Sequence, residues 1–319
     1  MEWDEQRLGR HLKLRDLNVL MTVARCGSMG KAAAQLSVSQ PAISKAIADM
    51  EYTLGVRLLD RSPQGVEPTI FARALLDRGL IAFDELKQAM KHIEFLANPT
   101  VGELRIAASV VVAASLVTVV LDQLTRRYPR IVFDLLVADP EMAYRALEER
   151  KVDLAILHIN VPVTEEQMHA EVLYDEPFIV VAGARNPWTR RRRIGLADLV
   201  NEPWTLPSPD SVHGSVIVEA FRASGLDFPR TMVIANVGPV RIALVATGRF
   251  LTIVPNSMSR FRVNHAALKR LPVDLPTARR PVGIFTLKNR TLSPVAQLFI
   301  DCARKVAKSM AGRPQSHRG

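Results

Sequence analysis

The amino-acid sequence predicts an α/β protein with a small helical N-terminal domain, a long connecting helix and a two-lobed C-terminal domain. Two observations support this prediction. Between Leu14 and Arg61, three short segments follow one another with the apolar spacing of helices. From Val101 onward, segments with the period of a strand alternate with helical ones, the first of which is expected at Leu116–Tyr128. This alternation predicts a parallel sheet covered by helices on both faces. One uninterrupted helical pattern, Thr69–Ala97, connects the two regions.

The N-terminal region has the pattern of two helices joined by a tight turn. Gly27 ends a first helix, and Ser28 is a suitable N-cap for a second, Ser28–Leu36. Only two residues separate that helix from Ser39, which we expect to cap a third. Pro41 is tolerated in the first turn of the third helix because the N–H at that position has no intrahelical acceptor.

The third helix has two distinct faces. One face is apolar, which predicts burial, and it carries Ile43, Ile47, Met50 and Leu54. The other face is small and polar, and it carries Gln40, Pro41, Ser44, Lys45 and Ala48. An amide, a hydroxyl and an ammonium without a carboxylate suit the base edges of a DNA major groove. The sequence therefore predicts a helix-turn-helix that presents this face to DNA.

This region resembles the N-terminal signature of LysR-type transcriptional regulators. The positions that carry the resemblance are Gly27-Ser28, Ala33-Ala34, Leu36, Ser39-Gln40-Pro41-Ala42-Ile43-Ser44, Ile47, Glu51, Leu54-Gly55 and Leu58-Leu59-Asp60-Arg61. Leu59 departs from the family, which most often has Phe there, and Met29-Gly30-Lys31 replaces a Phe-Thr-rich turn. The resemblance implies a regulator whose partner is double-stranded DNA. We expect the contacts with DNA to come from Ser39, Gln40, Pro41, Ser44, Lys45 and Arg61.

Two short extended pieces flank Pro63-Gln64-Gly65 and predict a hairpin, the wing of a winged helix-turn-helix. The resemblance implies that Arg61 and the wing tip reach the DNA backbone or the minor groove. Contacts of that kind position a protein without specifying the sequence. A surface ion pair between Arg61 and Asp60 is the alternative.

The long helix predicted over Thr69–Ala97 would span about 43 Å at the usual rise per residue. Its apolar residues form one stripe, made of Leu76, Leu80, Phe83, Leu86, Met90, Ile93 and Leu96. A single helix cannot bury such a stripe by itself, so we expect it to pack on the same helix of a second copy. The resemblance implies this pairing and a dimer of dimers, that is, a homotetramer. The alternative is that the helix lies on its own C-terminal domain.

Gly102–Ile106 and Val245–Pro255 resemble parts of the LysR effector domain, which has a periplasmic-binding-protein-like fold. The resemblance therefore extends over essentially the whole chain. It implies a winged helix-turn-helix DNA-binding domain at 11–68, a linker and dimerisation helix at 69–98, and an effector-binding and oligomerisation domain at 101–311. Lobe I of the last domain would comprise about 101–178 and 281–310, and lobe II about 179–280.

Ligands of open α/β sheets bind at the carboxyl ends of the strands. The candidate effector-binding residues at those ends are Ser109, Val110, Asp139, His158, Ser208, His213 and Val237. Each serine is equally suited to N-capping, and a lone histidine is more often structural. The histidines favour a carboxylate ligand, whereas Asp139 favours sugar hydroxyls or an amine. The identity of the small-molecule effector therefore stays open between a sugar and an aromatic or other carboxylic acid.

The net charge is +10, but the first hundred residues hold 13 Lys and Arg against 12 Asp and Glu. The prediction of DNA binding therefore depends on the motif and not on overall basicity. Arg190–Arg193 is a run of four arginines, for which a solvated loop is the simpler interpretation. Contact with bent DNA or with an acidic patch of RNA polymerase is the alternative.

Several other classes of protein are disfavoured. The N-terminal residues lack the apolar core of a signal peptide and no apolar run suffices to span a bilayer, so we expect a cytoplasmic protein without a membrane partner. Cys26 and Cys302 lie too far apart in sequence to suggest a disulfide or a metal site. We find no Gly-rich phosphate loop, nucleophile elbow or metal cluster, which predicts neither an enzyme nor a cofactor. A solute-binding transport protein is the second hypothesis, but it leaves Leu14–Ala97 unexplained.

Overall fold

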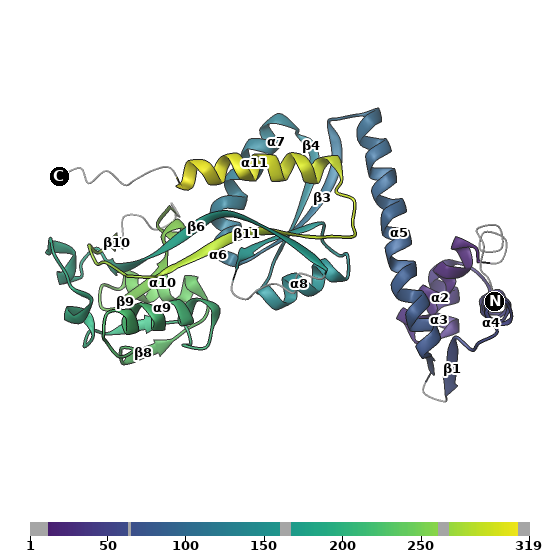
Figure 1. Ribbon diagram of the computed structural model, residues 1–319, viewed down its shortest axis with the longest axis horizontal. Helices are drawn as coiled ribbons and strands as arrows, with labels where there is room; N and C mark the ends of the chain where they lie inside the picture. The colour runs from purple at the N-terminus through teal and green to yellow at the C-terminus, as the bar shows by residue number, and fades with distance from the viewer. Residues whose placement is uncertain (1–11, 63–64, 160–166, 261–267, 312–319) are drawn as a thin grey trace. The chain divides into compact units, whose positions relative to one another are not determined.

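The computed structural model describes residues 12–62, 65–159, 167–260 and 268–311 (Figure 1). The chain divides into two compact units, Met1–Met90 and Lys91–Gly319. Each unit has an apolar core of its own. The long helix α5 (Ile70–Ala97) begins in the first unit and ends in the second.

The first unit contains the predicted helix-turn-helix and hairpin. Its elements before α5 are α2 (Leu14–Cys26), α3 (Met29–Leu36), α4 (Gln40–Leu54), β1 (Leu59–Ser62) and β2 (Gly65–Pro68). The Ser28 hydroxyl accepts a hydrogen bond from Lys31 N, and the Ser39 hydroxyl accepts one from Ala42 N. Both predicted N-caps are therefore confirmed. β1 and β2 pair antiparallel, as expected for the wing, although residues 63–64 at its tip lie outside the described residues.

The core of the first unit lies where α2, α3 and α4 meet. Leu20, Val23, Ile43 and Ile47 are fully buried there. The α5 helix closes against α2 at Gly79, where an added Cβ would lie 2.9 Å from the Leu17 side chain. A side chain at residue 79 would require the Leu17 side chain to shift, so glycine allows the two helices to approach closely here.

The hairpin is attached to the helices by backbone and side-chain hydrogen bonds. Val66 N donates to the carbonyl of Gly27 over 2.9 Å. Gly65 has φ +140°, and a Cβ there would lie 2.7 Å from the same carbonyl, so the crossing needs glycine. Glu51 of α4 accepts a hydrogen bond of 2.7 Å from Leu58 N, just before β1. The end of α4 therefore fixes where the wing begins.

The second unit is a mixed sheet covered by helices. The order of its strands is β4-β3-β5-β11-β6-β9-β7-β8, with β10 beside β6. The strands are β3 (Val101–Ala108), β4 (Arg130–Val137), β5 (Leu154–His158), β6 (Met168–Gly183), β7 (Trp204–Leu206), β8 (Thr231–Ile234), β9 (Leu251–Pro255), β10 (Leu268–Arg270) and β11 (Arg279–Leu287). The covering helices are α7 (Thr118–Arg127), α8 (Pro140–Glu148), α9 (Val212–Ala223), α10 (Gly238–Ala246) and α11 (Pro294–Ala311).

Two long central strands join the halves of this sheet. β3 runs parallel to β4 and β5, and β7 runs parallel to β8 and β9. The β6 and β11 strands run antiparallel to their neighbours and lie side by side between the two halves (Figure 1). The expectation of a parallel sheet is therefore wrong at the centre, because these two strands carry the chain from one half to the other and back.

Each half of the second unit has its own core. In the first half, α7 and α11 pack on the sheet around Leu104, Ile106 and Phe299. In the second half, α9 packs on the sheet around Trp204 and Phe221. The carboxyl ends of the strands on either side of the β6–β11 pair can therefore line a common cavity.

The helix that follows β3 begins earlier than Leu116, where the sequence predicted it. Three helical segments succeed one another without a break, namely α6 (Val110–Val112), the π-helical η1 (Ala113–Val117) and α7. The Ser115 hydroxyl donates to the carbonyl of Val111, within this helical run. The valines at its start favour a strand by propensity, and burial against the sheet overrides that preference.

Asp153 is a buried carboxylate that joins three basic side chains of the first half. Its oxygens lie 2.8 Å from Arg290, 3.0 Å from Arg105 and 3.3 Å from Lys91. Burial by itself raises the pKa of Asp153, but hydrogen bonds from the side chain and backbone of Arg105 and the charge of Lys91 bring that pKa below its ordinary value. Asp153 is therefore charged at neutral pH and holds the end of α5 to the sheet.

Candidate functional sites

The α4 helix has the two faces that the sequence predicts. Ile43, Ile47 and Met50 are buried, with at most 1% of their surface exposed. Ser39, Gln40, Pro41 and Lys45 are exposed, and Ser44 is half-buried. The opposite polarity of the two faces leaves the predicted DNA-contacting side chains of α4 on the surface of the first unit.

Two features beside this face bear on the individual predictions. The Ser39 hydroxyl is engaged in capping α4, so its primary role is to begin the helix. The Arg61 backbone pairs with Val66 in the hairpin, but its side chain lies outside the described residues. A Cβ added at Gly30 would lie 3.7 Å from the amide oxygen of Gln40, so the start of α3 leaves room for that amide.

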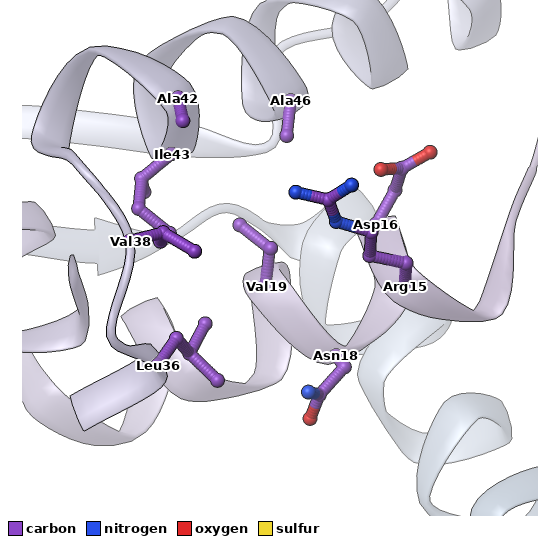
Figure 2. Close-up of a pocket in the computed structure, with 9 residues that line it drawn as sticks. All are labelled: Arg15, Asp16, Asn18, Val19, Leu36, Val38, Ala42, Ile43 and Ala46. Atoms are coloured by element: carbon purple, nitrogen blue, oxygen red, sulfur yellow. The ribbon is translucent and has the colours of Figure 1, made fainter.

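A shallow hollow of about 260 Å³ lies on the flank of α4, next to α2 and the turn that precedes α4. Figure 2 shows Arg15 reaching from α2 toward Ala46 of α4, while Asn18 points away from that contact. The walls are formed by Val19, Val38 and Ile43 together with small residues of α4. The hollow lies between α4 and the start of α2 and carries one basic group, Arg15.

A larger cavity, of about 530 Å³, lies in the second unit at the carboxyl ends of the strands. Its walls come from the last residues of β4 and β5 and from the segments that follow β3, β4, β7 and β8. These segments contribute Ser109 to Val111, Val137 to Pro140, His158, Pro207 with Ser211 to His213, and Asn236 to Gly238 with Arg241. Both halves of the sheet therefore line the cavity, as expected of a ligand site in an open α/β fold.

Six of the seven predicted effector-binding residues line this cavity: Ser109, Val110, Asp139, His158, His213 and Val237. Ser208 does not line it. Its backbone N–H donates to the side-chain oxygen of Asn236 over 2.8 Å, and its carbonyl accepts from the Ser211 hydroxyl over 2.6 Å. Ser208 therefore positions two polar residues of the wall and does not itself face the cavity.

The hydroxyl and carboxylate groups at the helix starts have different roles. Asp139 caps α8 by accepting from Met142 N over 2.8 Å, and Ser211 caps α9 by accepting from Gly214 N over 3.1 Å. Ser109 makes no such cap, and its hydroxyl oxygen is buried without a hydrogen-bond partner among the described residues. Of these three groups, the Ser109 hydroxyl is available to a ligand.

The two predicted histidines meet at the cavity wall. Nε2 of His158 lies 3.3 Å from Oε2 of Glu176, at an angle unsuited to a hydrogen bond. Glu176 is itself buried and accepts a hydrogen bond of 2.7 Å from Ser257 N. Burial, and secondarily the charges of His158, Arg241 and Arg280, lower the pKa of His213 to about 3. His213 is therefore uncharged at neutral pH.

Arg241 is a cavity residue that the sequence analysis did not identify. Only 1% of its surface is exposed, and Nη1 donates to the carbonyl of Ala235 over 3.0 Å. Nε is buried without a partner, and no carboxylate pairs with Arg241 among the described residues. Burial lowers its pKa to about 10, so the guanidinium keeps its charge at neutral pH. A lone arginine in the otherwise apolar α10 is the sequence signal that would have found it.

The arginine run lies apart from the cavity wall. Arg190 ends the short helix η2 (Pro187–Arg190), and Arg190 to Arg193 are all exposed. None of the four has an acidic partner within the part of the chain that the structure describes. The same part contains no group of three potential metal ligands and no helix long and apolar enough to cross a membrane.

Two family matches cover the two units. Residues 14–73 match the family described as "Bacterial regulatory helix-turn-helix protein, lysR family", and residues 97–308 match the "LysR substrate binding domain". The sequence is 27% identical to the regulator GbpR of Azospirillum brasilense over 307 residues, which is 96% of this chain and 90% of GbpR. It is 25% identical to the regulator TdcA of Escherichia coli K12 over 294 residues, or 92% of this chain and 93% of TdcA.

Solved structures have the same fold. A full-length OxyR variant from Pseudomonas aeruginosa superposes with a TM-score of 0.67 at 22% identity, covering 97% of this chain and 99% of that one. CbnR in complex with its target DNA gives a TM-score of 0.56 at 21% identity, covering 93% and 100%. These two structures therefore share the helix-turn-helix, the long helix and the two-part sheet of this chain.

Proposed function

The chain belongs to the LysR family of transcriptional regulators, and we propose that it binds a specific DNA site as a dimer of dimers under the control of a small molecule. It has a helix-turn-helix DNA-binding domain and an effector-binding domain.

The observation that carries the proposal is the polarity of α4. Its buried side is wholly apolar. The first part of the opposite face presents Gln40, the half-buried Ser44 and Lys45, and the exposed carboxylate of Asp49 follows one turn after Lys45. Amide and hydroxyl groups can donate to and accept from base edges, and the ammonium group can reach guanine or a phosphate. We assign Gln40, Pro41, Ser44 and Lys45 to the base-proximal face, with Ser39 at its start and Arg61 on the DNA backbone.

The cavity of the second unit is the proposed effector site. Segments from both halves of the sheet converge there, so a ligand that contacts both favours one relative position of the halves. We assign effector contact to Ser109, Val110, Asp139, His158, His213 and Val237. Ser208 is withdrawn from that set, because its backbone bonds serve Asn236 and Ser211.

The exposed apolar side chains of α5 support self-association. Leu86, Met90, Ile93 and Leu96 have between 48% and 71% of their surface exposed. We propose that residues 69–98 form the dimerisation helix between a DNA-binding domain at 11–68 and an effector-binding domain at 101–311. Lobe I then comprises about 101–178 and 281–310, and lobe II about 179–280. Two such helices together bury stripes that neither buries alone.

The remaining proposals follow from the role in transcription. A regulator that binds chromosomal DNA works in the cytoplasm, and RNA polymerase is its expected protein partner. We propose no catalytic role for the cavity. The relatives that match over nearly the whole chain are regulators by name, not enzymes or transport proteins.

A gel-shift experiment with full-length protein and the DNA upstream of its own gene tests this function. We expect the wild-type protein to form a complex that persists in excess nonspecific DNA. We expect the Gln40→Ala variant to form only a nonspecific complex. Lys87→Ala, an exposed change on α5, serves as the control for general charge loss. A wild-type protein that binds all DNA equally would contradict the proposal, as would full specificity in the Gln40 variant.

A further inference from the structure

We propose that the cavity takes a small monocarboxylic acid with an apolar body, and that Arg241 binds its carboxylate. The inference deepens the proposed function, since it requires that the cavity is the effector site. It decides between the sugar and the carboxylic acid that the sequence leaves open.

Arg241 is a buried cation that has no anionic partner among the described residues. Its Nη1 atom serves the carbonyl of Ala235, whereas Nε is buried and has no hydrogen-bond partner among the described residues. Burying an unpaired charge is costly, and folded proteins normally pair such a group with an opposite charge. The free edge of a guanidinium matches the two oxygens of a carboxylate. A carboxylate supplied by the effector meets both requirements.

Two further groups of the cavity suit an anion. The Ser109 hydroxyl and Nε2 of His213 are buried without partners among the described residues, and each can donate a hydrogen bond. The α10 helix begins at Gly238 on the cavity wall, its N-cap residue offers no side-chain acceptor, and the N-terminus of a helix favours negative charge. The residues that carry these donors line the cavity, Ser109 in one half of the sheet and His213 and Gly238 in the other.

Among the described residues of the cavity wall, the single carboxylate does not oppose this assignment. Asp139 is exposed and already accepts the capping hydrogen bond from Met142 N. Glu176, the other carboxylate nearby, lies behind His158 and is engaged by Ser257 N. Neither forms an ion pair with Arg241 among the described residues.

The rest of the wall indicates the body of the ligand. The surface of the wall is mostly apolar, and its apolar residues include Val110, Val111, Val137, Pro207, Val212 and Val237. A sugar needs a hydrogen-bonding group for nearly every hydroxyl, because each one left unpaired in the cavity loses its bonds to water. A benzene ring or a branched alkyl chain needs none. The wall therefore favours an apolar acid over a sugar.

A purely structural role for Arg241, holding the carbonyl of Ala235, makes a different prediction. If that bond is its purpose, Arg241→Met destabilises the ligand-free protein. If the role of Arg241 is to bind a ligand anion, the same change removes an unpaired buried charge from the ligand-free protein and leaves its melting temperature unchanged or higher. The ligand-free melting temperature of the variant therefore distinguishes the two roles.

The binding test uses matched pairs of acids and their amides. Full-length protein is titrated by calorimetry with benzoate and benzamide, phenylacetate and phenylacetamide, isovalerate and isovaleramide, and also with glucose and galactose. We expect at least one acid to bind, with its amide at least about 10-fold weaker. Arg241→Met should weaken the binding of that acid by about 10- to 100-fold, the range for loss of a hydrogen bond to a charged group. Arg222→Gln, an exposed change on α9, should have no effect.

Several outcomes overturn the inference. One is an amide or a sugar that binds as tightly as any acid, and another is acid binding that Arg241→Met leaves intact. Absence of binding by every acid of the panel also counts against it. The comparison of acid with amide uses the wild-type protein, so it stands even if the variant does not fold. Specific DNA binding measured in parallel shows whether the proposed regulatory function survives such a result.

Discussion

The imidazole rings of His158 and His213 meet edge to face at the cavity wall, with their centroids 5.1 Å apart. His158 ends β5 in one half of the sheet, and His213 lies in the first turn of α9 in the other half. The ring of Phe178, on the connecting strand β6, lies 5.7 Å from His213 and 6.5 Å from His158. The two halves therefore touch through titratable rings at the place where a ligand would contact both.

The His213 ring makes stability depend on pH in a defined window. Its pKa falls from 6.5 to about 3 on folding, through burial and through the charges of His158, Arg241 and Arg280. Below pH 6.5 the unfolded chain binds a proton that the folded chain does not, so stability falls as the pH falls toward 3. The loss is at most about 1.4 kcal/mol for each pH unit.

Replacing His213 removes this dependence. We expect His213→Gln to flatten the decline of the melting temperature between pH 7 and pH 4.5, measured by circular dichroism on the full-length protein. His169→Gln is the control, because His169 is exposed. If the two variants and the wild type decline in parallel, the ring of His213 takes up its proton in the folded state and its burial is not the cause.

The Asp153 cluster predicts a large loss of stability. Asp153→Ala leaves Lys91, Arg105 and Arg290 around an empty position, and breaking a buried ion pair from one side costs about 3–5 kcal/mol. The change in the free energy of unfolding is measured from the urea-induced unfolding transition of the second unit. The matched control is Asp122→Ala, which breaks an exposed pair with Arg126 and should alter the midpoint little. Equal effects of the two changes would mean that the cluster is open to solvent.

The elements with strong local signals could be predicted from the sequence. The N-caps Ser28 and Ser39, the apolar stripe of α4 and the two strands of the hairpin depend on neighbours within a few residues, and all are present. The start of the helix after β3 was missed, since Val110 to Val112 have strand propensity and only contact with the sheet makes them helical. The direction of β6 and β11 at the centre was missed because pairing between distant strands leaves no local pattern.

The candidate site divides in the same way. Six predicted residues at the ends of strands line the cavity, because ligands of open α/β sheets bind at the carboxyl ends of the strands. That rule does not tell which side chains at those ends turn toward the ligand. Ser208 does not line the cavity, whereas its backbone N–H and carbonyl bond to the side chains of Asn236 and Ser211. Arg241 lies about one turn into α10, well past the end of β8 at Ile234, so a search confined to strand ends passes over it.

The α5 stripe predicts that assembly depends on apolar contact. We expect the double change Leu86→Glu and Ile93→Glu to lower the oligomeric state of the full-length protein in sedimentation velocity, because each glutamate would be buried between two helices. Glu85→Gln and Glu94→Gln, on the same helix, provide the control without new charge. An unchanged sedimentation coefficient in the double variant would place the interface elsewhere.

Replacing the exposed arginines at 190–193 tests whether this charge run is only a solvated loop. We expect replacement of all four by alanine to leave the dependence of DNA affinity on salt concentration unchanged, as for a solvated loop. Each lost phosphate contact would instead reduce the slope of log affinity against log salt by about 0.9. A slope that falls by several times this amount would make the run part of the DNA-binding surface.

Gln40 and Arg61 should differ in how their loss affects DNA binding. Gln40 lies on the exposed face of α4, so Gln40→Ala should reduce discrimination between the specific site and a site with one altered base by about 1–3 kcal/mol. Ser44→Ala should act in the same direction. Arg61, at the hairpin, should contact phosphate. Arg61→Ala should therefore weaken binding to all DNA sequences alike and reduce the slope of log affinity against log salt by about 0.9. Competition gel shifts at two salt concentrations separate these effects. A uniform loss from Gln40→Ala, or a loss confined to the specific site from Arg61→Ala, would reverse the assignment of base and backbone contacts.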